Sequence, residues 1–246
     1  MVIEGLRKRL GEIEVLAGVD TCLAQGEITA FIGPNGAGKT TLFHTLTGEL
    51  KPDAGKVVFE GREISGKEPW DIARMGIGKV FQDVRVFPSL SVVDNVIAAL
   101  QRQPDYGLRA SLLRSARNVQ GNSRKAEALL DKVGVEGRRD GPAAELSWGN
   151  QKLLAFARLL AGDFRFVLLD EPVAGVSPVL RERMELLIRD LAMKDGVTVA
   201  LIEHDIAFVG ALANTVVVMK DGKVFDEGRA GEMLERPSNI ELCLGL

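Results

Sequence analysis

The sequence GPNGAGKTT at residues 33–41 decides the fold of this chain. A short apolar run at residues 27–33 leads into it, and a segment with helical spacing follows at residues 39–47. A glycine-rich turn of this kind, with a strand before it and a helix after it, is typical of a loop that binds the phosphates of a nucleotide. The predicted phosphate-binding residues are Gly33, Pro34, Asn35, Gly36, Ala37, Gly38, Lys39, Thr40 and Thr41.

The residue types in this loop suit a triphosphate. Glycines let backbone N–H groups point inward around a β-phosphate, and the N-terminus of the following helix adds partial positive charge. Lys39 is placed to neutralise the β- and γ-phosphate oxygens, and Thr40 to offer its hydroxyl to Mg²⁺. A glycine turn without a ligand would not explain a lysine and hydroxyls at these offsets. We therefore predict that the chain binds a nucleoside triphosphate with Mg²⁺.

Two carboxylates end a second apolar run, FVLLDE at residues 166–171. An unpaired buried charge is costly, so a strand that ends in Asp170 and Glu171 is expected to meet a cation there. Asp170 is predicted to orient the Mg²⁺ shell and Glu171 to polarise an attacking water. The alternative is a pair of surface acids, which fits this hexamer alone but not its combination with the phosphate loop.

A third apolar run, at residues 198–202, is followed by a histidine. His204, in the sequence IEHD at residues 202–205, lies just past a predicted core strand. Ligands of open α/β sheets bind at the carboxyl ends of strands, which places His204 at the predicted nucleotide edge. We predict a contact with the γ-phosphate; a purely structural histidine is the alternative. His44, inside the helix after the loop, is predicted to be structural.

Composition excludes several classes of protein. Hydrophobic residues at 46% and charged residues at 26% are typical of a folded globular protein. The net charge of −3 provides no basic field, so no nucleic-acid partner is expected. No apolar run reaches the roughly 18 residues of a membrane span, and the first residues lack the apolar core of a signal peptide. We expect a cytosolic or peripheral protein, with Cys22 and Cys243 as buried thiols.

The order of predicted elements indicates an α/β fold. Residues 2–23 alternate apolar and polar side chains, as antiparallel strands do. Apolar runs at residues 166–170, 198–202 and 215–219 are typical of strands buried on both faces of a parallel sheet. Residues 92–135 are mostly helical in pattern, which predicts a helical insertion in the α/β core.

Six motifs in order resemble one family. Along nearly its whole length the chain is similar to the ATP-binding subunit of ABC transporters. The matching residues are the phosphate loop at 33–41, Gln82 as the Q-loop glutamine, LSWGN at 146–150 as the signature motif, Asp170 with Glu171, AGVSP at 174–178 as the D-loop, and His204 as the switch histidine.

The resemblance implies a P-loop NTPase fold within one nucleotide-binding domain of residues 1–246. An ABC ATPase core with a parallel sheet would occupy residues 1–82 and 164–246. An N-terminal antiparallel β-subdomain would belong to that core, and a helical signature subdomain would span about residues 83–163.

The resemblance also implies ATP hydrolysis in a dimer. Each ATP would lie between the phosphate loop of one subunit and the signature motif of the other, contacted there by Ser147, Gly149 and Asn150. Glu171, His204 and Gln82 would be catalytic, and Thr40, Gln82 and Asp170 would hold Mg²⁺. The partner is either a second copy or a sister ABC ATPase subunit.

Several stretches look most like the ATPase subunits of branched-chain amino acid importers, including IARMGI at 72–77 and IEHD at 202–205. Such a subunit would power solute import from the cytoplasmic face of the cell membrane. Its partners would be membrane permease subunits and, indirectly, a solute-binding protein. In the family a groove around the Q-loop receives the permease, and residues 83–88 with the helical segment after them are the candidates here. The alternative is that the apolar Val84, Val86 and Phe87 are core residues of the subdomain.

Three other functions remain open at this point. The chain also shares much with the ATPase subunits of urea or amide importers and of lipopolysaccharide exporters. A soluble ABC ATPase without a transport role, such as an iron–sulfur assembly factor, is the third. The motifs identify neither the solute nor the direction of transport. They also do not distinguish a homodimer from a heterodimer.

Four residues depart from the family pattern. Leu10 stands where an aromatic residue usually stacks on adenine, so we expect weak discrimination between ATP and GTP. In the signature motif Trp148 replaces a frequent glycine and Asn150 replaces glutamine, while Ser177 replaces the D-loop aspartate. We expect the isolated subunit to hydrolyse ATP slowly.

Overall fold

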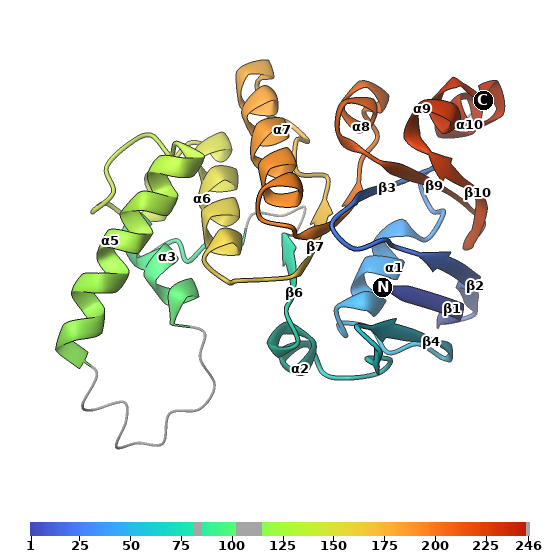
Figure 1. Cartoon of the computed structure of the whole chain (residues 1–246), viewed down its shortest axis with the longest axis horizontal. Helices are drawn as coiled ribbons and strands as arrows, with labels where there is room; N and C mark the ends of the chain where they lie inside the picture. Colours follow the sequence, from blue (N-terminus) through green and yellow to red (C-terminus); the bar gives the residue numbers. More distant parts are fainter. Residues whose placement is uncertain (81–84, 102–114, 245–246) are drawn as a thin grey trace. The chain divides into compact units, whose positions relative to one another are not determined.

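The computed structural model describes residues 1–80, 85–101 and 115–244 (Figure 1). Two compact units divide the chain. The first unit consists of Met1–Lys79, Arg165–Pro172 and Glu185–Leu246, and the second of Val80–Phe164 and Val173–Met184. Among the described residues, no helix combines the length and the apolar character needed to cross a membrane.

The first unit contains an antiparallel sheet in the order β2-β1-β4-β5, formed by β1 (Val2–Leu10), β2 (Ile13–Cys22), β4 (Ala54–Phe59) and β5 (Arg62–Glu63). The predicted antiparallel strands are thus confirmed. Inward side chains such as Ile3 and Leu16 are fully buried, as the apolar alternation requires. Cys22 is exposed, and its expected burial is wrong because the inward position at the end of β2 belongs to Thr21.

The second sheet of this unit has the order β10-β9-β3-β8-β7-β6. Its strands are β3 (Ile28–Ile32), β6 (Ile77–Val80), β7 (Phe166–Asp170), β8 (Thr198–Ile202), β9 (Thr215–Lys220) and β10 (Lys223–Arg229). The pairs β9–β3, β3–β8 and β8–β7 are parallel, as predicted from their continuous apolar runs.

The strand β10 makes the second sheet mixed, because it pairs antiparallel with β9. The predicted parallel pairing is confirmed for β9, β3, β8 and β7, and β10 adds an antiparallel strand at the edge. Asp221 and Gly222 connect the two strands with φ of 48° and 72°, a turn with positive φ at both positions that is typical of hairpins. Side chains of β10 alternate between half-buried and exposed, so this strand has no continuous apolar run.

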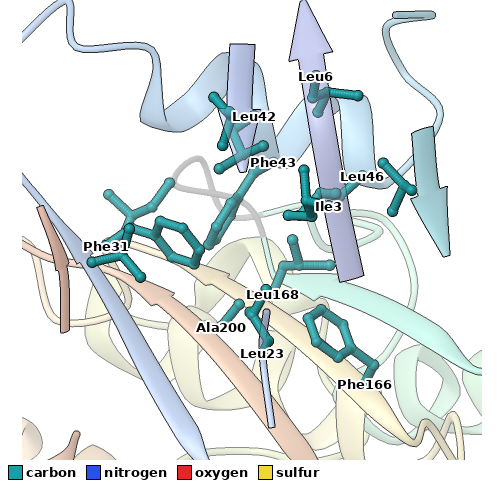
Figure 2. Packing of buried hydrophobic residues seen from close by; sticks show 14 of the residues in the cluster. Ile3, Leu6, Leu23, Phe31, Leu42, Phe43, Leu46, Phe166, Leu168 and Ala200 are labelled. Atoms are coloured by element: carbon teal, nitrogen blue, oxygen red, sulfur yellow. The ribbon is translucent and has the colours of Figure 1, made fainter. Parts of the chain in front are cut away.

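The remaining helices of the first unit are α1 (Lys39–Leu46), α2 (Pro69–Arg74), α8 (Ile206–Leu212), α9 (Ala230–Glu235) and α10 (Pro237–Leu244). One apolar core joins α1 to both sheets (Figure 2). The ring of Phe43 in α1 meets Phe31 of β3 edge to face, with centroids 5.7 Å apart. Because α1 follows the phosphate loop directly, this packing fixes the position of the loop.

The second unit is helical, as predicted. It contains α3 (Val92–Leu100), α5 (Ser115–Val133), a 3₁₀ turn at Ala143–Glu145 and α6 (Trp148–Leu160). The helix α7 (Pro178–Met193) begins in this unit and ends in the first. Apolar side chains of α3, α5 and α6 form its core, namely Val92, Val96, Ala126, Leu130, Leu154, Phe156 and Ala157.

Candidate functional site

The phosphate loop connects β3 to α1, and two of its glycines have no room for a side chain. A Cβ on Gly33 would lie 2.1 Å from the backbone oxygen of Met219, and one on Gly38 would lie 2.7 Å from that of Val15. Both glycines also have positive φ, 137° and 97°, which L side chains rarely adopt. The neighbouring strands therefore require glycine at these two positions.

Lys39 lies in the first turn of α1 and is only 6% exposed. Its ammonium donates hydrogen bonds to the backbone oxygens of Gly33 at 2.7 Å and Pro34 at 3.0 Å. Thr40, the next residue, is exposed. Since the free N–H groups and the positive end of the helix dipole lie at the same end of α1, the loop is built to bind an anion.

Asp170 ends β7 and is 3% exposed. Burial raises the pKa of its carboxyl group, while the nearby ammonium of Lys79, and less strongly that of Lys39, acts to lower it; the adjacent Glu171 acts to raise it. A buried carboxylate beside two lysines and the phosphate loop is an oxygen ligand of the kind that Mg²⁺ prefers.

Glu171 and His204 lie against each other at the same edge of the sheet. The strands β7 and β8 are parallel neighbours in which Asp170 pairs with Ile202, so the residues that follow each strand meet. The Glu171 Oε1 atom lies 3.1 Å from His204 Nε2. Glu171 has a φ of 48°, and its N–H donates to the Ile202 carbonyl at 3.0 Å.

An ion pair near Asp170, between Lys79 and Glu49, was not predicted from the sequence. The ammonium of Lys79 lies 3.0 Å from Glu49 Oε1, and its side chain is 4% exposed. Burial acts to raise the pKa of Glu49, but hydrogen bonds from Thr47 and Lys79 and the Lys79 charge bring that pKa below its ordinary value. The sequence offered one indication of this ion pair, namely Lys79 within the apolar strand β6, because a buried lysine needs a partner.

The signature residues lie in the second unit, at the start of α6. Ser147 is the N-cap of this helix, and its hydroxyl accepts a hydrogen bond from the N–H of Asn150 at 3.3 Å. The Asn150 side chain donates to the same hydroxyl at 3.1 Å. A Cβ on Gly149 would lie 2.6 Å from Leu180 Cδ2, so a larger residue here would require the Leu180 side chain to move.

A pocket of about 450 Å³ opens beside these residues within the second unit. Ser147, Trp148, Gly149 and Asn150 line it together with Gly175 and Ser177 of the D-loop. The predicted Gln82 lies outside the described residues. The structure thus brings the phosphate loop, Asp170, Glu171 and His204 together in the first unit and the three signature residues together in the second.

Comparisons with known proteins agree with this site. The profile of the ABC transporter family matches residues 16–174. The high-affinity branched-chain amino acid transport ATP-binding protein LivG of Salmonella typhimurium is 33% identical over 248 residues, covering 100% of this chain and 97% of that protein. A probable LivG of Archaeoglobus fulgidus is 35% identical over 246 residues, covering 98% of this chain and 94% of that protein.

Solved structures give the same result. The ADP conformation of an ATP-binding cassette of an ABC transporter superposes with a TM-score of 0.84 at 30% identity, covering 100% of this chain and 98% of the other. A dimeric cassette bound to ADP and Pi, in a post-hydrolysis state, superposes with a TM-score of 0.80 at 25% identity, covering 93% and 98%.

Proposed function

This chain belongs to the ABC transporter family, and we propose that it is the ATP-hydrolysing subunit that powers import of branched-chain or related amino acids through a separate permease. The main observation in favour of ATP hydrolysis is the 3.1 Å contact between Glu171 and His204. This contact lies at the sheet edge where the phosphate loop also lies. The solute is inferred from relatives of full length that are named for branched-chain amino acid transport.

The urea, lipopolysaccharide and iron–sulfur alternatives have less support. The LivG relatives match from end to end, and the BraF protein of Pseudomonas aeruginosa, also named for branched-chain amino acid transport, is 32% identical over 246 residues. None of these relatives is named for urea, lipopolysaccharide or iron–sulfur assembly.

The phosphate loop and Lys39 bind and orient the triphosphate of ATP. Backbone N–H groups of the loop and the ammonium of Lys39 surround the phosphate oxygens. Thr40, Asp170 and Gln82 would hold Mg²⁺, and the hydroxyl and the buried carboxylate observed here suit that ion. When bound, Mg²⁺ neutralises charge on the β- and γ-phosphates.

Glu171 is placed to orient the attacking water. Its carboxylate accepts a hydrogen bond from that water and takes its proton as the oxygen bonds to the γ-phosphorus. The bond between the γ-phosphorus and the bridging oxygen breaks, which leaves ADP and inorganic phosphate. His204 holds the Glu171 carboxylate through Nε2 and is placed beside the γ-phosphate.

A second subunit completes the site in this proposal. Ser147, Gly149 and Asn150 would contact the ATP held by the phosphate loop of the partner, with the positive end of α6 directed to the γ-phosphate. A dimeric solved relative supports two-subunit assembly. The partner is a second copy or a sister ABC ATPase subunit.

The permease would dock near the Q-loop, at the cytoplasmic face of the membrane. Phe87 is 47% exposed, so the alternative that it is a core residue is wrong. The buried Asn95 side chain binds both the N–H and the C=O of Phe87, and the Arg158 guanidinium lies 4.6 Å from its ring centroid. These contacts place Phe87 at the surface. A solute-binding protein would act indirectly, through the permease.

Two experiments test this proposal. Purified protein is assayed for phosphate release from ATP with Mg²⁺, with Lys39→Ala as the inactive reference. Protein tagged at its N-terminus is then isolated from solubilised native membranes, and the accompanying chains are identified by mass spectrometry. Phosphate release together with recovered polytopic permeases supports the proposal. Recovery of soluble proteins alone would favour a non-transport ATPase.

A further inference from the structure

Lys152, in α6, is a buried lysine with no role in the chemistry proposed above. The residue is 6% exposed, although lysines are almost never buried without a partner. Its ammonium donates a hydrogen bond of 2.7 Å to the backbone oxygen of Ala174, the first residue of the D-loop. The ammonium also lies 5.9 Å from the ring centroid of Trp148, within reach of a cation–π interaction.

Two further close approaches connect the same elements. A Cβ on Gly175 would lie 3.9 Å from Trp148 Nε1, and a Cβ on Gly149 would lie 2.6 Å from Leu180 Cδ2. The D-loop and the start of α7 therefore pack directly on the first turn of α6. The Lys152 hydrogen bond is charge-assisted, and such bonds are short and roughly twice as strong as hydrogen bonds between neutral groups.

Two motifs that Lys152 connects line one pocket. Ser147 and Gly149 of the signature motif line it together with Gly175 and Ser177 of the D-loop. All of them belong to the second unit. The Lys152 hydrogen bond runs from the helix that begins with the signature motif to the first residue of the D-loop.

We propose that Lys152 is a positioning residue that fixes the D-loop against the signature helix, so that the two motifs meet the partner's nucleotide as one surface. This inference rests on the proposed function. In this proposal Lys152 does not contact ATP, because the phosphate loop of the partner subunit binds that ATP first. Loss of the ammonium is therefore expected to slow turnover without weakening the initial binding of ATP.

The test compares Lys152→Met, which keeps the length of the side chain but removes the charge, with Lys152→Arg, which restores a donor. Lys194→Met is the matched control, since Lys194 pairs with Asp190 and its side chain is 72% exposed. All variants carry Trp70→Phe, so that Trp148 is the only tryptophan. Measurements are kcat and KM for ATP, affinity for a fluorescent ATP analogue, and Trp148 emission.

We expect Lys152→Met to lower kcat at least about tenfold, while KM and analogue affinity change less than about twofold. Trp148 emission should shift, because its ring loses a neighbouring cation. Lys152→Arg should keep at least half of the parent kcat, and Lys194→Met should match the parent in every measurement.

A kcat for Lys152→Met within about twofold of the parent would overturn the inference. Equal losses of kcat and analogue affinity would also overturn it, since they indicate a general structural role. If Lys152→Met does not fold, Lys152→Arg decides alone: a kcat below about a tenth of the parent value overturns the inference. Failure of the parent protein to hydrolyse ATP would instead count against the proposed function.

Discussion

The Oε1 atom of Glu171 lies 3.1 Å from Nε2 of His204, although the two residues follow different strands. Parallel pairing of β7 with β8 creates this contact, because Asp170 and Ile202 are register partners and the next residues leave the sheet together. Glu171 turns toward the site with a φ of 48°, a conformation that costs about 1 to 3 kcal/mol for a residue other than glycine. The pairing holds the carboxylate that the proposed water attack needs.

Replacement of His204 by alanine should lower kcat by about a hundredfold, because the Glu171 carboxylate loses its partner beside the γ-phosphate. The affinity for ATP should change little, since the phosphate loop supplies most of the binding. Phosphate release and binding of a fluorescent ATP analogue are the two measurements. His44→Ala is the control, because His44 is the only other histidine; equal losses in both variants would refute the role of His204.

Replacement of Gly33 by alanine should destabilise the fold by about 3 kcal/mol or more and abolish nucleotide binding. The added Cβ would lie 2.1 Å from the Met219 oxygen, on a residue whose φ is 137°. Gly66→Ala separates the steric clash from the cost of a positive φ, since Gly66 has a φ of 68° but no atom within 4 Å of its Cβ position. Urea denaturation should give the control a loss of about 1 to 2 kcal/mol. Similar losses in the two variants would show that Met219 does not exclude a side chain.

The carboxyl group of Asp170 should make stability depend on pH. Burial raises its pKa in the folded protein, so the folded state holds this proton more tightly than the unfolded chain does. The stabilising contribution is complete below the ordinary pKa of an aspartate and is lost as pH rises through the folded pKa.

Asp170→Asn should therefore unfold at a higher temperature than the parent at pH 7, and this advantage should shrink toward pH 4. Thermal denaturation followed by circular dichroism at several pH values measures the difference. Asp195→Asn, at an exposed aspartate, is the control and should show no such trend. An Asp170→Asn protein less stable than the parent at pH 7 would contradict the expectation.

Because of Leu10, the protein should discriminate poorly between adenine and guanine nucleotides. Leu10 is 44% exposed at the end of β1, and its cross-strand partner Ile13 is 70% exposed, so this hairpin presents aliphatic side chains. Affinities for ATP and GTP should differ less than about tenfold, or about 1.4 kcal/mol. Leu10→Phe should strengthen ATP binding by about 1 to 3 kcal/mol, because a ring can stack on adenine.

Fluorescent analogues of the two nucleotides measure these affinities. Val2→Phe, at the exposed start of the same strand, is the control and should have no effect. A preference for ATP above about tenfold in the parent protein would contradict the expectation.

Strand positions could be predicted well where the sequence has continuous apolar runs. The strands β3, β7, β8 and β9 lie at the predicted positions because each is buried on both faces. The edge strand β10 has no such run, and only its turn at Asp221 and Gly222 indicates a hairpin.

The candidate site was predictable where a motif defines it locally, as in the phosphate loop. The pairs Lys79 with Glu49 and Lys152 with Ala174 were not predictable. Each joins residues on different elements whose approach depends on the packed fold. In both pairs the sequence shows only a lysine inside an apolar segment, which indicates that a partner exists but does not identify it.

The most direct test of the proposed function is uptake of radiolabelled leucine by cells in which the gene is deleted and then restored. We expect deletion to abolish leucine uptake through this system, the wild-type gene to restore it, and Glu171→Gln, produced at the same level, to fail. Leucine uptake at the wild-type rate in cells whose only copy carries Glu171→Gln would contradict the claim that ATP hydrolysis at this site powers the import.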